Sequence, residues 1–488
     1  MRRLGSQTTI NKVVTPSSAR VSSVVFHRWS FEGQESGVAV YLDPFGLSPG
    51  NPGGNGDIDG DGGRGWTYTR WTSPEREIGF PATELVPSWT ANTPPGAWLE
   101  VELQARTMGG ALTKWYCMGR WAEGDTDIHR TSLPGQGDQD GDVAVDTFVA
   151  TRPIVAYRIR ITLYGEGASI RSIGVMASAV PPGGPASAVS TTVTGTAGAG
   201  TAPAGRPLAD ESPGQVPALE PASAANTTMA AEATHATLTA AALLSAPATP
   251  AANAQDALDA QDAQLTRIAR LAQDARSARA PRAEAAGVEL NVPRRSQKVH
   301  AGHQPQWDGG GESWCSPASF TMVLGYWGRG PSPEDLEWVS PDDPCPGVDH
   351  AARDMYDHGY QGTGNWPFGV AYAGRYGLEG FVTRLRSLSE LELFICAGIP
   401  VITSQSFKEH ELPGSGYSTS GHIMVVTGIT PAGDVIANDP AAPSDETVRR
   451  VYPREAFQNV WLRGSSSGGI VHVVHPPDVP LPLSEGNW

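Results

Sequence analysis

The sequence predicts a multidomain protein, with an all-β region near the N-terminus and an α+β region near the C-terminus. Three observations support this prediction. Residues 24–180 contain segments that alternate apolar and polar side chains with the period of two typical of strands. Residues 181–287 are rich in small residues and proline, the composition of a low-complexity linker. Residues 288–480 contain both helix-like and strand-like stretches, and residues 481–488 form a short tail.

Composition and charge argue against some classes of partner. The chain has 488 residues, with 35 Lys and Arg against 51 Asp and Glu, and a formal net charge of −16. This acidic balance argues against nucleic acid or an anionic membrane as the main partner. No stretch approaches the roughly 20 apolar residues of a membrane-spanning helix, so we expect no transmembrane segment. The oligomeric state stays open.

The first 23 residues leave the location of the protein open. They begin with two arginines after the initial Met, as an export signal does, but the apolar segment of about 7–15 residues that should follow is missing. We therefore expect residues 1–23 to form a disordered arm, which fits a secreted and a cytoplasmic protein alike.

The strands of the N-terminal region are predicted from alternation and turn signals. In the segment Trp98–Arg106, apolar and polar residues alternate, which indicates a strand with one wet face. A Met-Gly-Gly turn at 108–110 lets residues 112–121 return as the second strand of a hairpin. Residues 157–163 alternate in the same way. Because no convincing amphipathic helix occurs here, we expect residues 24–180 to form a jelly-roll-like β-sandwich.

The linker is expected to contain one short helix. Its first part, up to about Pro250, has almost no aromatic residues and cannot bury enough surface to fold by itself. Residues 253–286 are helix-like, and the apolar residues on one side are Leu258, Leu265, Ile268 and Leu271. This apolar stripe is too brief to predict an oligomer, so a spacer helix is the favoured interpretation.

The C-terminal region is predicted to combine helices with strands. Helices are expected at Ser316–Trp327 and Leu388–Ala397. Strands are expected at Ile399–Gln405, His422–Ile429, Asp434–Asn438 and Ile470–Val474.

Cys315 is the first candidate for a catalytic residue. The glycine run Gly309–Gly311 leads to this cysteine, which stands at the start of a predicted helix. Pro317 is tolerated there because the first N–H groups of a helix have no partner within the helix. The helix dipole and these amides favour an anion, so the pKa of the thiol should lie below its usual value of about 8.5. A buried, unreactive cysteine is the alternative.

A histidine and an aspartate follow on a predicted hairpin. His422 begins one strand, and the turn at 431–433 returns the chain toward Asn438 and Asp439. Folding about this turn places Asp439 roughly opposite Val426, within a few residues of His422. A carboxylate or amide can then hold one imidazole nitrogen while the other nitrogen faces the thiol. A nucleophile, a base and an orienting residue are the parts that acyl transfer by cysteine requires.

Residues 291–475 resemble the family 39 type of cysteine peptidases, the group that processes bacteriocin leaders, together with its broader relatives. The motifs that carry the resemblance are Trp314–Ser319, Ala397–Ile402, Gly421–Val426 and Asn438–Pro440. The resemblance implies a papain-like fold, with Cys315 as nucleophile, His422 as base and Asp439 as orienting residue. The layout, with a β region before the peptidase-like region, also resembles secreted bacterial proteins.

One position departs from the family pattern. The family places an oxyanion-hole glutamine shortly before the cysteine, at the position of Gly309. Gln306 lies a few residues earlier, with Gln304 and Gln297 before it. If the glycine run loops out, Gln306 comes into range, so Gln306 is the candidate donor, although a surface loop is the simpler interpretation for each of the three. Such a donor is typically worth about 10²–10³ in rate.

Several other groups of residues have simpler explanations than a binding site. Two Asp/Gly-rich segments, at 57–62 and 138–146, have the alternating oxygens of a calcium loop, but solvated turns are favoured because Tyr68 replaces the acidic residue that should close the first loop. The histidines at 300, 303, 350 and 358 lack the spacing of a known metal site and are expected to be solvated. We therefore expect no metal ion and no cofactor.

The tryptophans and the remaining cysteines have core positions as their favoured interpretation. A glycan or cell-wall face on the β region could be lined by Trp66, Trp71, Trp89, Trp98, Trp115 and Trp121. Core packing explains most of these rings more simply. Cys117 is expected in the core, and Cys345 and Cys396 could pair only in an oxidising compartment.

These observations predict a hydrolase: a cysteine peptidase that cleaves peptide bonds through a Cys315–His422–Asp439 triad and a thioester acyl-enzyme. Its partner is then a peptide or protein substrate. The alternative is a non-catalytic surface protein, whose β region recognises a glycan or protein and whose C-terminal region is a degenerate peptidase-like module. The glycine at position 309, where the family has its oxyanion-hole glutamine, favours the non-catalytic alternative. The intact Cys315, His422 and Asp439 favour the enzyme.

Overall fold

The computed structural model describes residues 23–31, 68–126, 128–179, 285–463 and 468–488. Residues 1–22 of the predicted N-terminal arm, nearly all of the linker with its helix, and the first Asp/Gly-rich segment lie outside the described residues, whereas Ser23 begins β1. The two described regions, one on each side of the linker, belong to the same compact unit of the chain.

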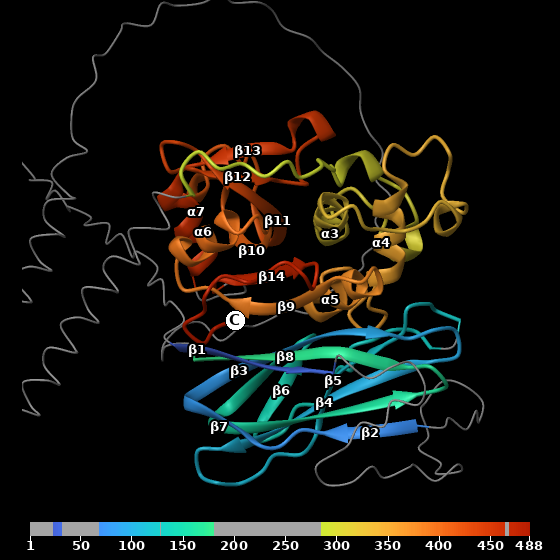
Figure 1. The fold of residues 1–488 in the computed structure, drawn as a ribbon, viewed down its shortest axis with the longest axis vertical. Coiled ribbons are helices and arrows are strands. Elements are labelled where there is room, and N and C mark those ends of the chain that lie inside the picture. The colour runs from blue at the N-terminus through green and yellow to red at the C-terminus, as the bar shows by residue number, and fades with distance from the viewer. Residues whose placement is uncertain (1–22, 32–67, 127, 180–284, 464–467) are drawn as a thin grey trace, which may run out of the picture. The chain divides into compact units, whose positions relative to one another are not determined.

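The N-terminal region is a single hydrogen-bonded sheet of eight antiparallel strands (Figure 1). Six strands follow the order β1-β8-β3-β7-β4-β5, and β2 and β6 also pair with β7. The strands are β1 (Ser23–Ser30), β2 (Tyr68–Thr72), β3 (Arg76–Asn92), β4 (Trp98–Thr107), β5 (Tyr116–Trp121), β6 (Gly141–Ala144), β7 (Thr147–Tyr164) and β8 (Ser169–Ala179).

The hairpin predicted from alternation is present as β4 and β5. Leu99 lies opposite Trp121, and the two strands run antiparallel. The apolar residues of β4 are fully buried, as the period of two requires. The opposite face is only partly exposed to solvent. There Glu100 forms an ion pair with Arg120, and Glu102 forms one with Arg160.

The predicted β-rich character of residues 24–180 is confirmed. The described strands form one hydrogen-bonded sheet, whereas a β-sandwich has two separate sheets. β3 has 17 residues and β7 has 18. The first half of β3 pairs with β7 and the second half with β8, with shifts of register between them. Long strands with such irregularities bend, so one strand can serve two parts of a curved sheet. The jelly-roll arrangement stays a prediction.

The C-terminal region is α+β, as predicted, with a second sheet of six strands (Figure 1). The order of the strands is β13-β12-β11-β10-β14-β9. They are β9 (Glu379–Arg384), β10 (Val401–Phe407), β11 (Thr419–Ile429), β12 (Val435–Asn438), β13 (Arg449–Tyr452) and β14 (Ile470–His475). The helices are α3 (Cys315–Tyr326), α4 (Pro346–Met355), α5 (Trp366–Arg375), α6 (Leu388–Cys396) and α7 (Arg454–Leu462).

Both predicted helices and all four predicted strands of this region are present, with ends displaced by a few residues. The helices α4, α5 and α7 and the strands β9 and β13 were not predicted. Helix α5 is buried from Pro367 to Gly374, so it has no polar face to give a helical period. Its start depends on Asn365, whose side chain accepts a hydrogen bond from the Phe368 N–H. Within the described residues, no helix has the length and apolar character needed to cross a membrane.

Buried polar contacts join the two described regions within their common unit. Arg384 on β9 donates to Glu84 on β3 at 2.7 Å, and the exposed fractions of these side chains are 5% and 6%. The Val382 N–H donates to the Ser88 Oγ at 2.9 Å. A charge pair buried this deeply is costly to break, because either partner alone would be an uncompensated charge in the interior.

Glu84→Gln is expected to lower the free energy of unfolding by about 3–5 kcal/mol, because Arg384 would then be buried without its carboxylate. Urea denaturation followed by tryptophan fluorescence measures this change. Glu75→Gln is the matched control, since its pair with Arg106 is about one-third exposed (33% and 29%). Loss of such a pair should cost less than about 1 kcal/mol. Equal losses in the two variants would contradict the prediction.

Candidate active site

Cys315 is the first residue of α3, at the end of a glycine-rich loop. Gly309, Gly310 and Gly311 all have positive φ, which favours glycine. A side chain at Gly310 would begin 1.9 Å from the His300 carbonyl oxygen, so no other residue fits this position. The residue as a whole is partly exposed, and the stripe of α3 that holds it in place includes the fully buried Phe320 and Val323.

His422 lies near the start of β11 and faces both Cys315 and Asp439. Its Nε2 is 2.8 Å from the Asp439 Oδ1. Its ring also interacts with the Cys315 side chain, which lowers the pKa of Cys315 and raises that of His422. Because Nε2 is engaged by the carboxylate, Nδ1 is the ring nitrogen left for an interaction with the sulfur. His422 is 5% exposed, so this line of three side chains is largely closed to water on the histidine side.

Asp439 is a buried carboxylate with several donors. Besides His422, it accepts from the Tyr417 hydroxyl at 2.9 Å and the Tyr452 hydroxyl at 2.6 Å. The Ala441 N–H also donates to it at 2.9 Å. Burial alone would raise the pKa of Asp439, but the charge and hydrogen bond of His422, together with the Tyr452 and Ala441 donors, lower it to about 2. The residue is therefore a fixed anion at neutral pH.

The register of the β11–β12 hairpin differs from the predicted one, and the difference brings Asp439 closer to His422. Ala437, not Asp439, lies opposite Val426, because the register shifts between Val426 and Gly428. Asn438 lies opposite Val425. The irregularity moves Asp439 further along β11, toward His422, than a regular hairpin would. The prediction that Asp439 lies opposite Val426 was therefore wrong by two residues, while the contact with His422 is present.

The charges of this group favour a thiolate beside an imidazolium. Burial would raise the pKa of Cys315, but the hydrogen bond and charge of His422 and the N–H groups of Ile423 and Ser316 bring it below the ordinary value. Burial would lower the pKa of His422, but Asp439 and Cys315 raise it to about 10. By contrast, burial raises the pKa of Cys345 to about 12.

The candidate glutamines differ in burial and in their hydrogen-bond partners. Gln306, the predicted oxyanion donor, is exposed, and its Nε2 donates to the Gln304 Oε1 at 3.0 Å. Gln297 is buried, and its Nε2 donates to the Gly311 carbonyl at 2.6 Å. The Gln297 N–H donates to the carbonyl of Pro440, the residue after Asp439. Gln297 thus contacts the loop before Cys315 and the segment after Asp439, whereas Gln306 contacts its own loop.

Sequence reasoning missed the polar residues that surround the three central side chains. Tyr417 and Tyr452 hold Asp439 from a loop and from β13. Gln405 lies directly opposite His422 on β10, and its buried side-chain nitrogen and oxygen have no hydrogen-bond partner among the described residues. No motif or spacing marks these positions, because the sheet brings together strands distant in sequence.

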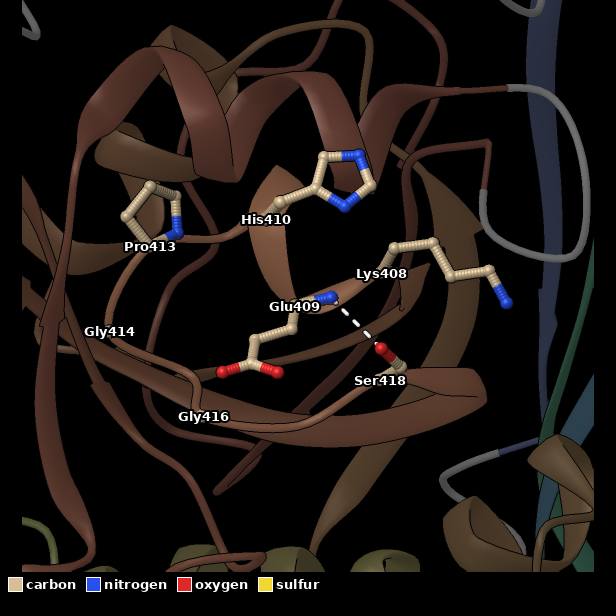
Figure 2. Close-up of a pocket in the computed structure, with 7 residues that line it drawn as sticks. All are labelled: Lys408, Glu409, His410, Pro413, Gly414, Gly416 and Ser418. Atoms are coloured by element: carbon tan, nitrogen blue, oxygen red, sulfur yellow. Dashed lines mark hydrogen bonds between the residues drawn. The ribbon is translucent and has the colours of Figure 1, made fainter.

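An open pocket lies beside the loop that precedes β11 (Figure 2). Its lining includes Lys408, Glu409 and Ser418, and the Glu409 N–H donates to the Ser418 Oγ at 3.0 Å. Gly416 and Ser418, the two neighbours of Tyr417, both line it. None of the three residues Cys315, His422 and Asp439 lines this pocket, so it adjoins the site only through the loop that carries Tyr417.

Other groups that the sequence singled out take up different positions. Asp138 accepts hydrogen bonds from Tyr116 and from the N–H groups of Asp140 and Gly141, as in a turn. Trp89, Trp98 and Trp121 are fully buried and Trp71 is largely buried, as core packing predicts, and Trp115 packs against Arg158 and Arg160. None of the four cysteines forms a disulfide bond, and Cys117 and Cys345 are buried whereas Cys396 is exposed.

The expectation of solvated histidines at 300 and 350 was wrong. Both side chains are fully buried. His300 Nδ1 lies 2.8 Å from Asp349 Oδ2, and His350 Nδ1 lies 3.1 Å from the Tyr372 hydroxyl. The loop that carries His300 folds against α4, so a residue that looks exposed in a polar stretch of sequence is enclosed by tertiary contacts.

Comparisons with known proteins match both described regions to peptidases. Residues 289–468 match the model of the Peptidase C39-like family, and residues 24–178 match that of a peptidase C39 N-terminal domain. The resemblance to family 39 peptidases that the sequence motifs predicted is therefore confirmed. These matches support a peptidase.

A solved structure of a C39-like peptidase from Bacillus anthracis is 17% identical, with a TM-score of 0.26. The match covers 38% of this chain and 96% of the other. At this score the likeness carries no argument about the fold. No curated protein matches the chain.

Asp439→Asn is expected to lower the pKa of His422, because the variant removes the anion that stabilises the imidazolium. NMR titration of the histidine ring protons measures the shift. The folded-state pKa of about 10 lies above the ordinary value of 6.5. The wild-type interaction therefore stabilises the fold fully below about pH 6.5, and this contribution is lost as the pH rises through the folded pKa.

The variant should lose most of this stability at neutral pH. His350 and His472 are internal controls, since burial lowers the pKa of His350 to about 4 and that of His472 to about 3. Their titration should not change. An unchanged pKa of His422 in the variant would show that Asp439 does not control the protonation of this ring.

Proposed function

We propose that this chain, whose two described regions match a peptidase C39 N-terminal domain and the Peptidase C39-like family, is a cysteine peptidase with Cys315 as its nucleophile. The observation that carries this proposal is the meeting of Cys315, His422 and Asp439: His422 Nε2 lies 2.8 Å from Asp439 Oδ1, and the interaction with His422 lowers the pKa of Cys315. A buried anion beside a histidine, and that histidine beside a partly exposed thiol, form an arrangement that activates a cysteine.

In the proposed reaction, the Cys315 thiolate attacks the carbonyl carbon of a peptide bond, and a C–S bond forms. The tetrahedral intermediate collapses when the His422 imidazolium gives its proton to the leaving amine nitrogen and the C–N bond breaks. His422, now neutral, takes a proton from a water molecule that attacks the thioester. The C–S bond then breaks and releases a carboxylic acid, which regenerates the thiolate.

Asp439 acts as the orienting residue in this proposal. Its hydrogen bond to Nε2 fixes the ring so that Nδ1 faces the sulfur, and its charge stabilises the imidazolium. Tyr417 and Tyr452 in turn hold the carboxylate. A cysteine at a helix start and a histidine on a sheet, in the chain order Cys, His, Asp, support a papain-like arrangement, which we include in the proposal.

The oxyanion of the tetrahedral intermediate needs hydrogen-bond donors. The N–H of Cys315, in the first turn of α3, is one candidate because it has no partner within the helix. We propose the side chain of Gln297 as the second donor, in place of Gln306. Gln297 is buried and tied to both sides of the site, and an amide nitrogen has two hydrogens, only one of which is used in the bond to Gly311.

Iodoacetamide should alkylate Cys315 near pH 6 roughly ten to a hundred times faster than Cys396. Cys315 remains ionised when the pH falls below the pKa of an ordinary thiol, and the thiolate is the reactive form. Mass spectrometry of the full chain reads the rate at each cysteine. His422→Ala should remove the advantage of Cys315, because the imidazolium that stabilises the thiolate is lost.

Cys396 is the reference within the same molecule, since its side chain is exposed. A rate at Cys315 no greater than that at Cys396, in the wild type, would overturn the peptidase proposal. The non-catalytic alternative predicts that result, and it would direct attention to glycan and protein binding by the β-rich region.

Gln297→Ala is expected to lower kcat by about 10²–10³, as loss of an oxyanion donor does. The substrate is a fluorogenic peptide selected with the wild type from a random library. Gln306→Ala is the matched control and should leave kcat unchanged. The alkylation rate of Cys315 should stay the same in both variants, because an oxyanion donor does not act on the free thiol.

A fall in both kcat and the alkylation rate of Gln297→Ala would indicate a distorted loop instead of a lost donor. Full activity in Gln297→Ala would exclude the side chain of Gln297 from the oxyanion hole.

A further inference from the structure

Two histidines and two aspartates gather away from Cys315, between the loop before it and the start of α4. His300 ends a short 3-10 turn, Lys298–His300, and His303 follows in the same loop. Asp343 precedes α4, and Asp349 lies in its first turn. One nitrogen or oxygen atom from each of the four residues lies within 4.8 Å of the other three. Residues far apart in the chain thus offer four donor atoms to a common point.

The distances show that the donor atoms face one another. His300 Nδ1 lies 2.8 Å from Asp349 Oδ2. His303 Nδ1 lies 3.1 Å from Asp343 Oδ2 and 3.4 Å from Asp349 Oδ1. His303 therefore approaches both carboxylates at similar distances instead of pairing with one of them. Such shared approach is typical of donors arranged around a centre.

Three of the four side chains are closed to solvent. The side chains of Asp343 and Asp349 are 1% exposed and that of His300 is fully buried, whereas His303 is 34% exposed. Asp343 Oδ2 and Asp349 Oδ1 are buried and accept no well-directed hydrogen bond among the described residues, although His303 Nδ1 lies 3.1 and 3.4 Å from them. Two adjacent carboxylates with unsatisfied oxygens are costly in a protein interior unless a cation compensates them.

We propose that His300, His303, Asp343 and Asp349 bind one divalent transition-metal ion, with zinc as the best match. Two imidazole nitrogens and two carboxylate oxygens suit a four-coordinate zinc, whereas calcium and magnesium require mainly oxygen ligands. The charge of the ion balances the two carboxylates. The Cys345 N–H donates to Asp343 Oδ1 at 2.7 Å, which leaves Oδ2 to face the histidines and supplies the outer contact that orients a ligand.

Two simple His–Asp ion pairs are the competing explanation. In that case both imidazoles are protonated, and each carboxylate keeps one histidine. His303 lies between both carboxylates without a well-directed hydrogen bond to Asp343 Oδ2 or Asp349 Oδ1, and this arrangement favours the metal. This proposal departs from the absence of metal expected from the sequence, where the spacing of these residues matched no known motif.

A metal at this position would fasten the loop before Cys315 to α4. His300 and His303 lie between Gln297 and Cys315 in the chain, and the His300 carbonyl packs directly against Gly310. The ion would act on the structure of this loop and not on the reacting bond. The metal site is independent of the proposed peptidase function, because none of its four ligands is a proposed catalytic residue.

The test uses the full chain without an affinity tag and with Cys315→Ala, so that the reactive thiol cannot bind zinc. After treatment with a strong chelator and dialysis, zinc is titrated and the bound metal is measured by mass spectrometry. One equivalent is expected to bind, and the melting temperature should rise by several degrees, since the ion binds the folded chain preferentially. Cobalt in place of zinc should give the visible absorption of a four-coordinate site.

Asp349→Asn keeps the shape of the ligand but removes its charge, and it should weaken zinc binding about 100-fold or more. His129→Ala is the matched control. It lies in a second cluster, with Asp125 and His358, but His129 is 65% exposed and Asp125 is already paired with Arg130 at 3.0 Å. This control should retain one equivalent of zinc with unchanged affinity.

Three results would overturn the proposal: no zinc bound to the parent chain, zinc bound equally well by Asp349→Asn, or zinc lost in His129→Ala alone. If Asp349→Asn fails to fold, His303→Ala replaces it, because this ligand is partly exposed and its loss leaves the interior intact. The same loss of zinc is then expected.

Discussion

The carboxylate of Asp439 connects three separate segments of the C-terminal region. It receives hydrogen bonds from β11 through His422, from β13 through Tyr452, and from the loop before β11 through Tyr417. An ionised group this deeply buried is stable only with such a complete set of donors. The position of the imidazole, the register of β11 and β12 and the path of the loop that carries Tyr417 are therefore mutually dependent.

The charges of Asp439 and His422 contribute to stability over different ranges of pH. The low pKa of Asp439 contributes stability at neutral pH that is lost as the pH falls through the acidic range. The high pKa of His422 contributes stability that is complete below about pH 6.5 and is lost as the pH rises toward about 10. The pair is thus charged across the whole neutral range, and the reactivity of Cys315 depends on geometry that a change of one pH unit near neutrality does not alter.

Features encoded over short stretches of sequence could be predicted, whereas those made by distant contacts could not. Alternation and a turn signal predicted β4 and β5. Local motifs identified Cys315 at the start of a helix and His422 and Asp439 on the hairpin. The sequence reading failed at Gln297 and His300, because their burial depends on loops folding against Pro440 and α4. It also failed at α5, whose enclosure on all sides removes the polar face that marks a helix. The register irregularity near Thr427 has no local signal either.

The contrast among the four cysteines has a consequence for oxidation. Ionised, accessible sulfur is the form that peroxide attacks first, giving a sulfenic acid that thiols can reverse and then higher acids that they cannot. Cys315 is partly exposed and its pKa is lowered, whereas burial raises the pKa of Cys117 and Cys345. The environment that lowers the pKa of Cys315 therefore also makes this residue more prone to oxidation in air than the two buried cysteines. A preparation stored without reductant would therefore lose the Cys315 thiol before the buried thiols of Cys117 and Cys345 react.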